Sequence, residues 1–205
     1  MRLSAAAKNV MLNALDESQA AGMKFASLHN AYNSAGTGST ELTGGSYARQ
    51  PVVWDPANLG AKATNGNIVF QVAGGAQVRF VGFWDAVTAG NFLGMTPNGG
   101  GIPQAFVVPD VATLDVLECV AHGFVDTDVV TVWAVPGDPL PGGLTEGNLY
   151  FVVNKTNDDL QLSLTSGGAP INLSAIGAGT LQKVVVENFG AAGTHTLTAV
   201  TMSLD

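Results

Sequence analysis

Apolar residues in this chain recur mostly at every second position, in short runs separated by glycine, proline and asparagine. The run at residues 160–164 is the clearest, because its three leucines alternate with a glutamine and a serine. A period of two places alternate side chains on opposite faces of a strand, so this run predicts a half-buried strand. With the apolar run at 149–153 and the Asn- and Asp-rich segment 154–159 between them, it predicts a β-hairpin.

The same pattern predicts most of the remaining chain to be short strands. They are expected at residues 23–29, 48–54, 67–72, 77–84, 92–95, 114–120, 129–135 and 194–204. The run at 77–84 is apolar on both alternating faces, which predicts a central strand or a face reserved for another subunit. In the last run Leu197 is out of phase with Val200 and Met202, which indicates a bulge or burial on both sides.

One helix is predicted, from about Ser4 to Ala20, with Ser4 as its N-cap and Gly22 as its stop. Its apolar residues are expected on one face: Ala7, Val10, Met11, Ala14 and Leu15. This face would pack on a sheet of the same chain or, as an alternative, on a neighbouring subunit. The predicted fold class is therefore mainly β: a β-sandwich-like base domain with one N-terminal α-helix, plus a small inserted β module.

Composition supports a globular protein, since 46% of the 205 residues are hydrophobic and 12% are charged. The single cysteine, Cys119, excludes an internal disulfide framework and a multi-cysteine zinc site, and its apolar neighbours predict a buried thiol. There is no run of about 18 apolar residues and no signal-peptide core near the N-terminus. We therefore expect a soluble protein made in a cytoplasm, with no membrane partner.

Charge is unevenly distributed along the chain. Residues 1–110 hold six basic and six acidic residues, whereas residues 111–205 hold two basic and ten acidic residues, which accounts for the net charge of −8. An acidic surface repels phosphate, and no basic stripe offsets it elsewhere. Nucleic acid is therefore not an expected partner.

Candidate catalytic and metal-binding residues are few. The three histidines, His29, His122 and His195, are far apart in sequence, and no His-x-x-x-His or Cys-x-x-Cys spacing occurs. Four aspartates, Asp126, Asp128, Asp158 and Asp159, could contribute oxygen ligands to Ca²⁺, but their spacing fits no EF-hand loop and favours turn roles. We expect no enzyme activity, no catalytic residues, no cofactor and no metal site.

Large aromatic residues are the other candidates for binding. Those singled out are Trp54, Phe83, Trp84, Trp133, Tyr150 and Phe151. Most are expected in the core, because a β-rich chain with few large side chains needs them there. A carbohydrate platform on the inserted module is the alternative.

A break in the chain at residues 98–103, with three consecutive glycines, separates two compositional regions. Three segments before it carry a recognisable pattern: FASLH at 25–29, ELTGGSYARQPVVW at 41–54 and VGFWDAVTAGNFLG at 81–94. Together with the terminal segment at 193–204, they resemble a family of small tailed-bacteriophage virion proteins, variously described as tail fibre, head-decoration or minor capsid proteins. Residues 111–183 resemble a second recurrent phage structural module.

The resemblance implies a discontinuous virion-binding base domain formed by residues 1–110 and 184–205, interrupted by an acidic β module at 111–183. Its motif residues, with an expected structural role, are Leu28, His29, Gly44, Gly45, Tyr47, Ala48, Arg49, Trp54, Gly82, Phe83 and Trp84. The implied location is the virion, after synthesis in the bacterial host cytoplasm.

The resemblance also implies a function, that of a non-enzymatic virion structural protein. The first expectation is a capsid-decoration or minor capsid protein that stabilises the shell by binding the major capsid protein or other virion subunits. The alternative is a tail fibre or tail-tip adhesin that recognises the host, with a surface glycan as a possible ligand. A homo-oligomer, with a trimer as the first guess, is expected in either role.

Overall fold

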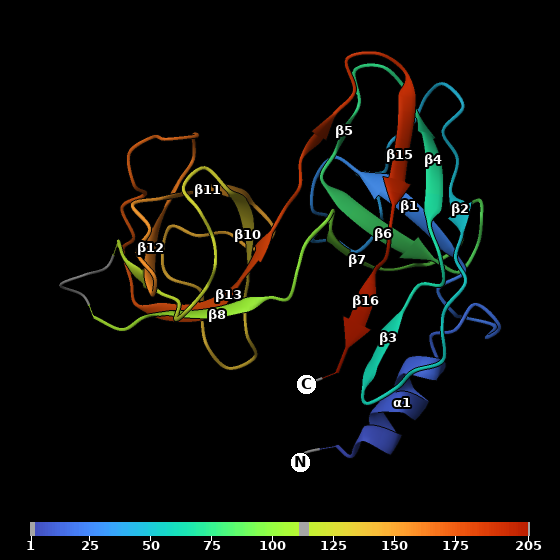
Figure 1. Cartoon of the computed structure of the whole chain (residues 1–205), viewed down its shortest axis with the longest axis horizontal. Helices are drawn as coiled ribbons and strands as arrows, with labels where there is room; N and C mark the ends of the chain where they lie inside the picture. The colour runs from blue at the N-terminus through green and yellow to red at the C-terminus, as the bar shows by residue number, and fades with distance from the viewer. Residues whose placement is uncertain (1–2, 111–114, 205) are drawn as a thin grey trace. The chain divides into compact units, whose positions relative to one another are not determined.

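The structure is a computed structural model that describes residues 3–110 and 115–204. The fold is mainly β, as predicted, and the described residues include a single α-helix (Figure 1). The chain forms two compact units, here called unit 1 (Met1–Thr96 with Glu187–Asp205) and unit 2 (Pro97–Val186).

The elements alternate with glycine-rich turns along both units. Unit 1 contains α1 (Ala5–Asn13), β1 (Phe25–His29), β2 (Gln50–Pro51), β3 (Ala61–Ala63), β4 (Ile68–Val72), β5 (Gln77–Val78), β6 (Phe80–Trp84), β7 (Phe92–Pro97), β14 (Glu187–Asn188), β15 (Gly193–Leu197) and β16 (Thr201–Ser203). Unit 2 contains β8 (Gln104–Val108), β9 (Leu117–Glu118), β10 (Val129–Trp133), β11 (Leu149–Val153), β12 (Asp159–Ser163) and β13 (Gly177–Lys183).

The largest sheet of unit 1 has the strand order β2-β1-β6-β7. β6 pairs antiparallel with β1, so that Ser27 lies opposite Gly82 and His29 opposite Phe80. All five β6 residues are buried. The prediction of a central strand in this run is therefore confirmed.

The C-terminal segment of unit 1 runs back along three earlier strands. β14 pairs with β5, β15 with β4 and β16 with β3, all antiparallel. Figure 1 shows β15 beside β4 and β16 beside β3. Leu197 ends β15, and Thr201 begins the separate strand β16. The phase slip at Leu197 therefore comes from a change of pairing partner rather than from a bulge inside one strand.

The four-stranded sheet is covered on both faces. On one face Ala26, Leu28, Val81 and Phe83 join the main core of unit 1. That core also includes Met23, Leu42, Val52, Trp54, Ile68, Phe70, Val72, Val78, Leu197 and Val200. Successive strand residues point to opposite faces, so Ser27, His29, Gly82 and Trp84 lie on the other face.

Helix α1 is shorter than predicted and turns a different face inward. It ends at Asn13, and its buried residue is Leu12, whereas Val10 and Met11 are 71% and 51% exposed. The amide oxygen of Asn13 accepts hydrogen bonds from the Ala57 backbone N–H and from Lys62. These bonds tie the end of the helix to the segment around β3, beside which it lies in Figure 1, and sequence periodicity cannot anticipate them.

Unit 2 is a closed barrel with the strand order β10-β11-β12-β9-β8-β13, in which β13 pairs back to β10. Its core consists of Phe106, Val108, Leu117, Cys119, Phe124, Val130, Val132, Tyr150, Val152, Leu160, Leu162, Leu173 and Leu181. The predicted hairpin of β11 and β12 is confirmed, with Val152 opposite Leu162. Cys119 is 1% exposed, as its apolar neighbours predicted.

Four strands were missed by the sequence pattern: β3, β8, β13 and β14. β8 and β13 pair along their length and lie in unit 2, so this compact unit begins at Pro97 and ends at Val186, whereas the sequence placed the module at 111–183. β13 contains two glycines and a lysine among few large apolar groups, so alternation is weak there. Part of the strand expected at 114–120 lies outside the described residues; the rest of it includes the two-residue strand β9.

Candidate functional site

A buried chain of hydrogen bonds around His29 is the main polar feature of unit 1. Trp84 Nε1 donates to Ser27 Oγ at 2.8 Å, and Ser27 Oγ lies 2.7 Å from His29 Nε2. On the other side of the ring, His29 Nδ1 lies 3.0 Å from Thr40 Oγ1, which donates to the Ala31 carbonyl at 2.7 Å. We call these five residues the His29 network.

The partners fix the protonation state of His29. The Thr40 hydroxyl proton is used on a carbonyl, so Nδ1 carries a proton and donates to Thr40, while Nε2 accepts from Ser27. His29 is 0% exposed, and burial together with the charge of Arg49 lowers the pKa of His29 to about 4. The ring is therefore neutral near neutral pH, with both nitrogens satisfied.

Gly82 provides the space that the His29 network needs. A Cβ at this position would lie 2.4 Å from His29 Nε2, 2.7 Å from Ser27 Oγ and 2.8 Å from Phe92 Cε2. Such distances are far inside van der Waals contact. A glycine is required here because the side chains of β1 cross directly over the backbone of β6.

Arg49 covers the outer side of the same sheet face. Its Cζ atom lies 3.3 Å from the centroid of a Trp84 ring, a close cation–π contact. Its Nε and Nη2 atoms form a bidentate pair with Glu41, the Nη2 to Oε2 distance being 2.8 Å. Both side chains are largely buried, at 11% and 17% exposure. The pair therefore seals Trp84 under a planar, fully paired cation.

The remaining donor of Arg49 organises a loop. Nη1 donates to the carbonyls of Ala86 at 3.0 Å and Ala89 at 2.7 Å. Asp85 holds the same loop from its other end, accepting from the Asn91 backbone and side chain, both at 2.7 Å. These bonds lower the pKa of Asp85 below its usual value. Segments 41–49 and 85–91 are thus joined through one guanidinium.

Tyr47 connects this cluster to the main core. Its hydroxyl accepts from the Leu28 backbone N–H at 2.8 Å and donates to Glu41 at 3.3 Å. Its ring stacks on Phe70, with centroids 6.4 Å apart. Burial is the main cause that raises the pKa of Tyr47 well above its usual range. The phenol therefore stays protonated and can keep both bonds.

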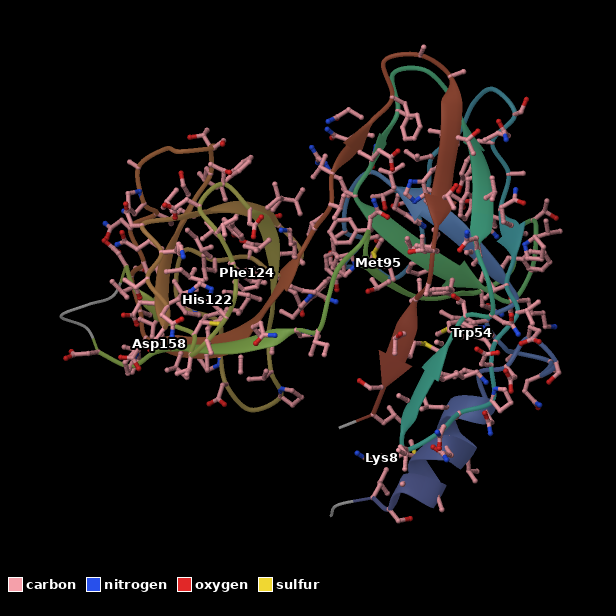
Figure 2. The ribbon with its side chains drawn as sticks, in the orientation of Figure 1. Lys8, Trp54, Met95, His122, Phe124 and Asp158 are labelled. Carbon is pink, nitrogen blue, oxygen red and sulfur yellow. The ribbon has the colours of Figure 1, made fainter. Side chains whose placement is uncertain are left out.

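The other motif residues lie outside the His29 network. Gly44 and Gly45 have φ of 97° and 59°, which explains glycine in this exposed turn. Ala48 is exposed. Trp54 packs on Phe83 in the core on the opposite sheet face, with ring centroids 5.5 Å apart, and Figure 2 labels its position.

This arrangement cannot act as a Ser-His catalytic pair. Ser27 and His29 are both 0% exposed, and the Ser27 oxygen already accepts from Trp84. A nucleophile needs an exposed oxygen and space for a reacting atom. The cluster instead cross-links β1, β6 and the loops around 40, 49 and 86, which is a structural role.

His195 lies elsewhere in unit 1. It is 4% exposed, and its Nδ1 atom lies 2.6 Å from Glu187 Oε2. Its Nε2 atom is buried and has no hydrogen-bond partner among the described residues. The histidines are therefore not gathered into one site.

His122 closes a loop of unit 2. Its Nδ1 atom accepts from the Phe124 backbone N–H at 2.9 Å, so the ring proton is on Nε2, 3.4 Å from the Asp159 carbonyl. The rings of His122 and Phe124 stack with centroids 5.4 Å apart. Figure 2 labels both residues. His122 thus supports loop 119–128, in which Ala121 and Thr127 adopt positive φ of 52° and 75°.

The aspartates considered for Ca²⁺ instead satisfy backbone donors of this region. Asp126 accepts from the Lys155 N–H, Asp128 from the Val125 N–H and Lys183, and Asp158 from the Ala121 N–H. Across residues 3–110 and 115–204, no group of three or more His, Cys, Asp or Glu side chains has the arrangement of a metal site.

Most of the candidate aromatic residues are in the two cores. Trp54, Phe83, Trp84 and Tyr150 are each no more than 6% exposed, while Trp133 and Phe151 are half-buried. Five residues of the polar and aromatic cluster around His29, Arg49 and Trp84 were not singled out from the sequence: Ser27, Thr40, Glu41, Asp85 and Phe92. All but Thr40 lie in the three segments singled out from the sequence, but their contacts join positions as far apart as Ser27 and Trp84 or His29 and Phe92, which spacing alone does not reveal.

The geometry defines a β-rich protein in which several of the motif residues, among them His29, Arg49 and Trp84, build a cross-linked cluster. Residues 2–99, just under half of the chain, match the model of a family described as "Podophage GP4 fiber I protein gp80". This similarity supports a phage virion protein family, and all eleven motif residues fall within the matched region. No curated protein and no solved structure matches the chain.

The matched region ends at residue 99, close to Pro97, where unit 2 begins. Strands β14, β15 and β16 lie outside it, although they pair with β5, β4 and β3 of the matched region. Among the residues that the structure describes, no helix combines the length and apolar character needed to span a bilayer.

Proposed function

We propose that this protein is a non-enzymatic fibre component of a phage virion, in which unit 1 is the base that attaches to the particle and unit 2 is a module carried by it. The observation that carries the proposal is the similarity of residues 2–99 to a podophage fibre protein family, over the part of the chain that holds the His29 network. Unit 1 has the properties of an attachment base, because the network cross-links its strands and loops into a rigid scaffold.

The insertion of unit 2 is supported by the way the chain crosses between the units. Val185 donates its N–H to the Asn98 carbonyl at 2.8 Å, and Asn98 Nδ2 donates to the Val185 carbonyl at 2.9 Å. Asn98 is 4% exposed, so this clamp is shielded from water. The two ends of the module are therefore adjacent, as an insertion into a continuous base domain requires.

A capsid-decoration role is the second candidate. It is favoured by the exposed apolar side chains of unit 1 around α1, Val10 at 71% and Met11 at 51%, with Leu59 at 82% in the turn held to the helix by Asn9. Such groups would gain by burial against a neighbouring shell subunit. Many copies bound to a symmetric shell would together stabilise it, because their individually weak contacts act multivalently.

Electron microscopy of the virion, with labelled protein, separates the two roles. A position on the tail with a copy number set by tail symmetry is expected for a fibre component. A copy number comparable to that of the major capsid protein would identify a decoration protein. Absence from purified particles would refute both, and glycan hydrolysis by the purified protein would refute the non-enzymatic assignment.

Attachment by unit 1 has its own test. A variant in which residues 99–184 are replaced by a two-glycine turn should fold and should bind particles that lack the protein, because the clamp residues Asn98 and Val185 are already adjacent. A matched variant with Gly190→Ala, at an exposed position of unit 1, serves as the unperturbed reference. A folded deletion variant that fails to bind would show that unit 2 carries the attachment.

A further inference from the structure

An open groove on unit 1 adjoins the His29 network and shares Ala31 with it. It has a volume of about 420 Å³ and is lined by Asn30, Ala31, Gly75, Ala76, Gln77 and Arg79, among others. This volume is in the range of pockets that hold small ligands. Its small residues leave the backbone accessible: a Cβ placed on Gly75 would meet no atom within 4 Å.

Arg79 is the charged residue of this groove. Its Nη1 atom makes a long hydrogen bond of 3.3 Å to the Asn30 carbonyl, and its Nε atom is buried without a hydrogen-bond partner. Among the described residues, no carboxylate forms an ion pair with it. A guanidinium has five N–H donors; leaving the buried Nε–H unpaired is unfavourable, while the terminal nitrogens of this partly exposed side chain keep donors available to a ligand.

The contrast with Arg49 shows what Arg79 lacks. Arg49 is also partly buried, but its guanidinium is saturated by the Glu41 carboxylate and two carbonyls. The guanidinium of Arg79 makes a single long hydrogen bond, to the Asn30 carbonyl. A carboxylate is the acceptor that pairs with Arg49, and Arg79 has none among the described residues.

We propose that this groove binds a carboxylate-bearing ligand through the guanidinium of Arg79. Because Nε is sealed, the carboxylate meets the terminal nitrogens and forms an end-on bidentate pair. Gln77, which also lines the groove, already donates its side-chain amide to Asn188 Oδ1, so Arg79 is the group offered to the ligand. A single cation suits a monoanion better than a phosphate dianion, which usually recruits several cationic or N–H donors. The binding holds for a fibre or a shell location alike.

The test is a titration of the full chain labelled with ¹⁵N, followed by NMR. The probes are glucuronate, an acidic sugar, and N-acetylglutamate, which mimics an acidic peptide side chain, with glucose and inorganic phosphate as comparisons. Shifts of the Arg79 Nε–H signal and of backbone amides 30, 31 and 75–77 are expected with at least one carboxylate. The tighter of the two carboxylates identifies the source of the group.

Three variants make the result specific. Arg79→Gln should weaken carboxylate binding at least about tenfold, and Arg79→Lys should weaken it too, because lysine retains the charge but loses the fork. Lys155→Gln removes one exposed charge from unit 2 and should leave binding unchanged. Spectra of the free variants establish that each is folded.

Four results would overturn the proposal. They are no shift with either carboxylate, equal binding by Arg79→Gln, equal binding of glucose, and tighter binding of phosphate than of both carboxylates. If Arg79→Gln does not fold, the comparison of Arg79→Lys with the parent chain decides the question in the same way.

Discussion

Gly82→Ala tests the argument that the backbone of β6 must lie directly under the side chains of β1. The added methyl would lie 2.4 Å from His29 Nε2, 2.7 Å from Ser27 Oγ and 2.8 Å from Phe92 Cε2. His29 and Ser27 are 0% exposed, so they have no solvent to move into, and Phe92 is partly buried.

The expected loss has two parts. Forcing a methyl into a filled site costs about 1–3 kcal/mol. Separating Ser27 from His29 breaks a buried hydrogen bond worth about 1 kcal/mol. The free energy of unfolding of unit 1 should therefore fall by about 2–4 kcal/mol, and its Tm by about 8–16 °C at roughly 4 °C per kcal/mol.

Unit 1 and unit 2 can unfold separately, so the assay must resolve them. Hydrogen exchange followed by mass spectrometry does this, with peptides from β1 and β6 reporting on unit 1 and peptides from β10 on unit 2. Gly190→Ala is the matched control, because Gly190 is exposed and a Cβ there meets nothing within 4 Å. It should change stability by less than about 0.5 kcal/mol. An equally small change for Gly82→Ala would refute the close-approach argument.

Three further predictions concern the charged and titrating groups of unit 1. Burial lowers the pKa of His29 from 6.5 to about 4, so as the pH falls the unfolded chain protonates this imidazole before the folded chain does. The free energy of unfolding should therefore be unaffected by His29 above about pH 6.5 and should decrease by about 3 kcal/mol towards pH 4. An NMR titration of the His29 ring in the folded protein that gives a pKa near 6.5 would contradict this. Arg49→Lys should cost about 2 kcal/mol and speed hydrogen exchange in loop 85–91, because lysine cannot form the fork to Glu41 and bridge two carbonyls; unchanged exchange would argue against the bridge. Asp16→Ala should lower the free energy of unfolding, measured by chemical denaturation, by about 3–5 kcal/mol, because it leaves the fully buried Lys62 ammonium without its carboxylate. Adding Lys62→Met to this variant should recover most of the lost free energy.

Local patterns in the sequence were sufficient where a single strand or turn carries its own signal. The alternation at 160–164 predicted β12 and its hairpin with β11, and the two-sided apolar run at 77–84 predicted a central strand; both are confirmed. The same reasoning failed for α1, whose exposed Val10 and Met11 were expected to be buried. Periodicity identifies an apolar stripe, but the contacts of Asn13 with the segment around β3 decide which side of the helix turns inward.

The sequence was sufficient to single out several residues of the candidate site, but not to predict the contacts between them. Arg49, Trp84 and Gly82 were singled out because they lie in segments that resemble phage virion proteins. The reason for a glycine at 82 appears only when β1 and β6 pair in register and bring His29 over its backbone. Glu41 and Asp85 were not singled out, since no spacing rule links segments 41–49 and 85–91 to the guanidinium of Arg49.

By itself the sequence determined a mainly β chain with one N-terminal helix, an uneven charge and a set of motif residues. The resemblance had already implied that the C-terminal segment belongs with the N-terminal part, but only the tertiary structure decided how it does so: β14, β15 and β16 each pair with a strand from residues 61–78. The tertiary structure likewise decided that His29 and Ser27 form a sealed structural network rather than a reactive pair. Burial and hydrogen-bond direction decide between those roles, and both are properties of strands brought together from distant parts of the chain.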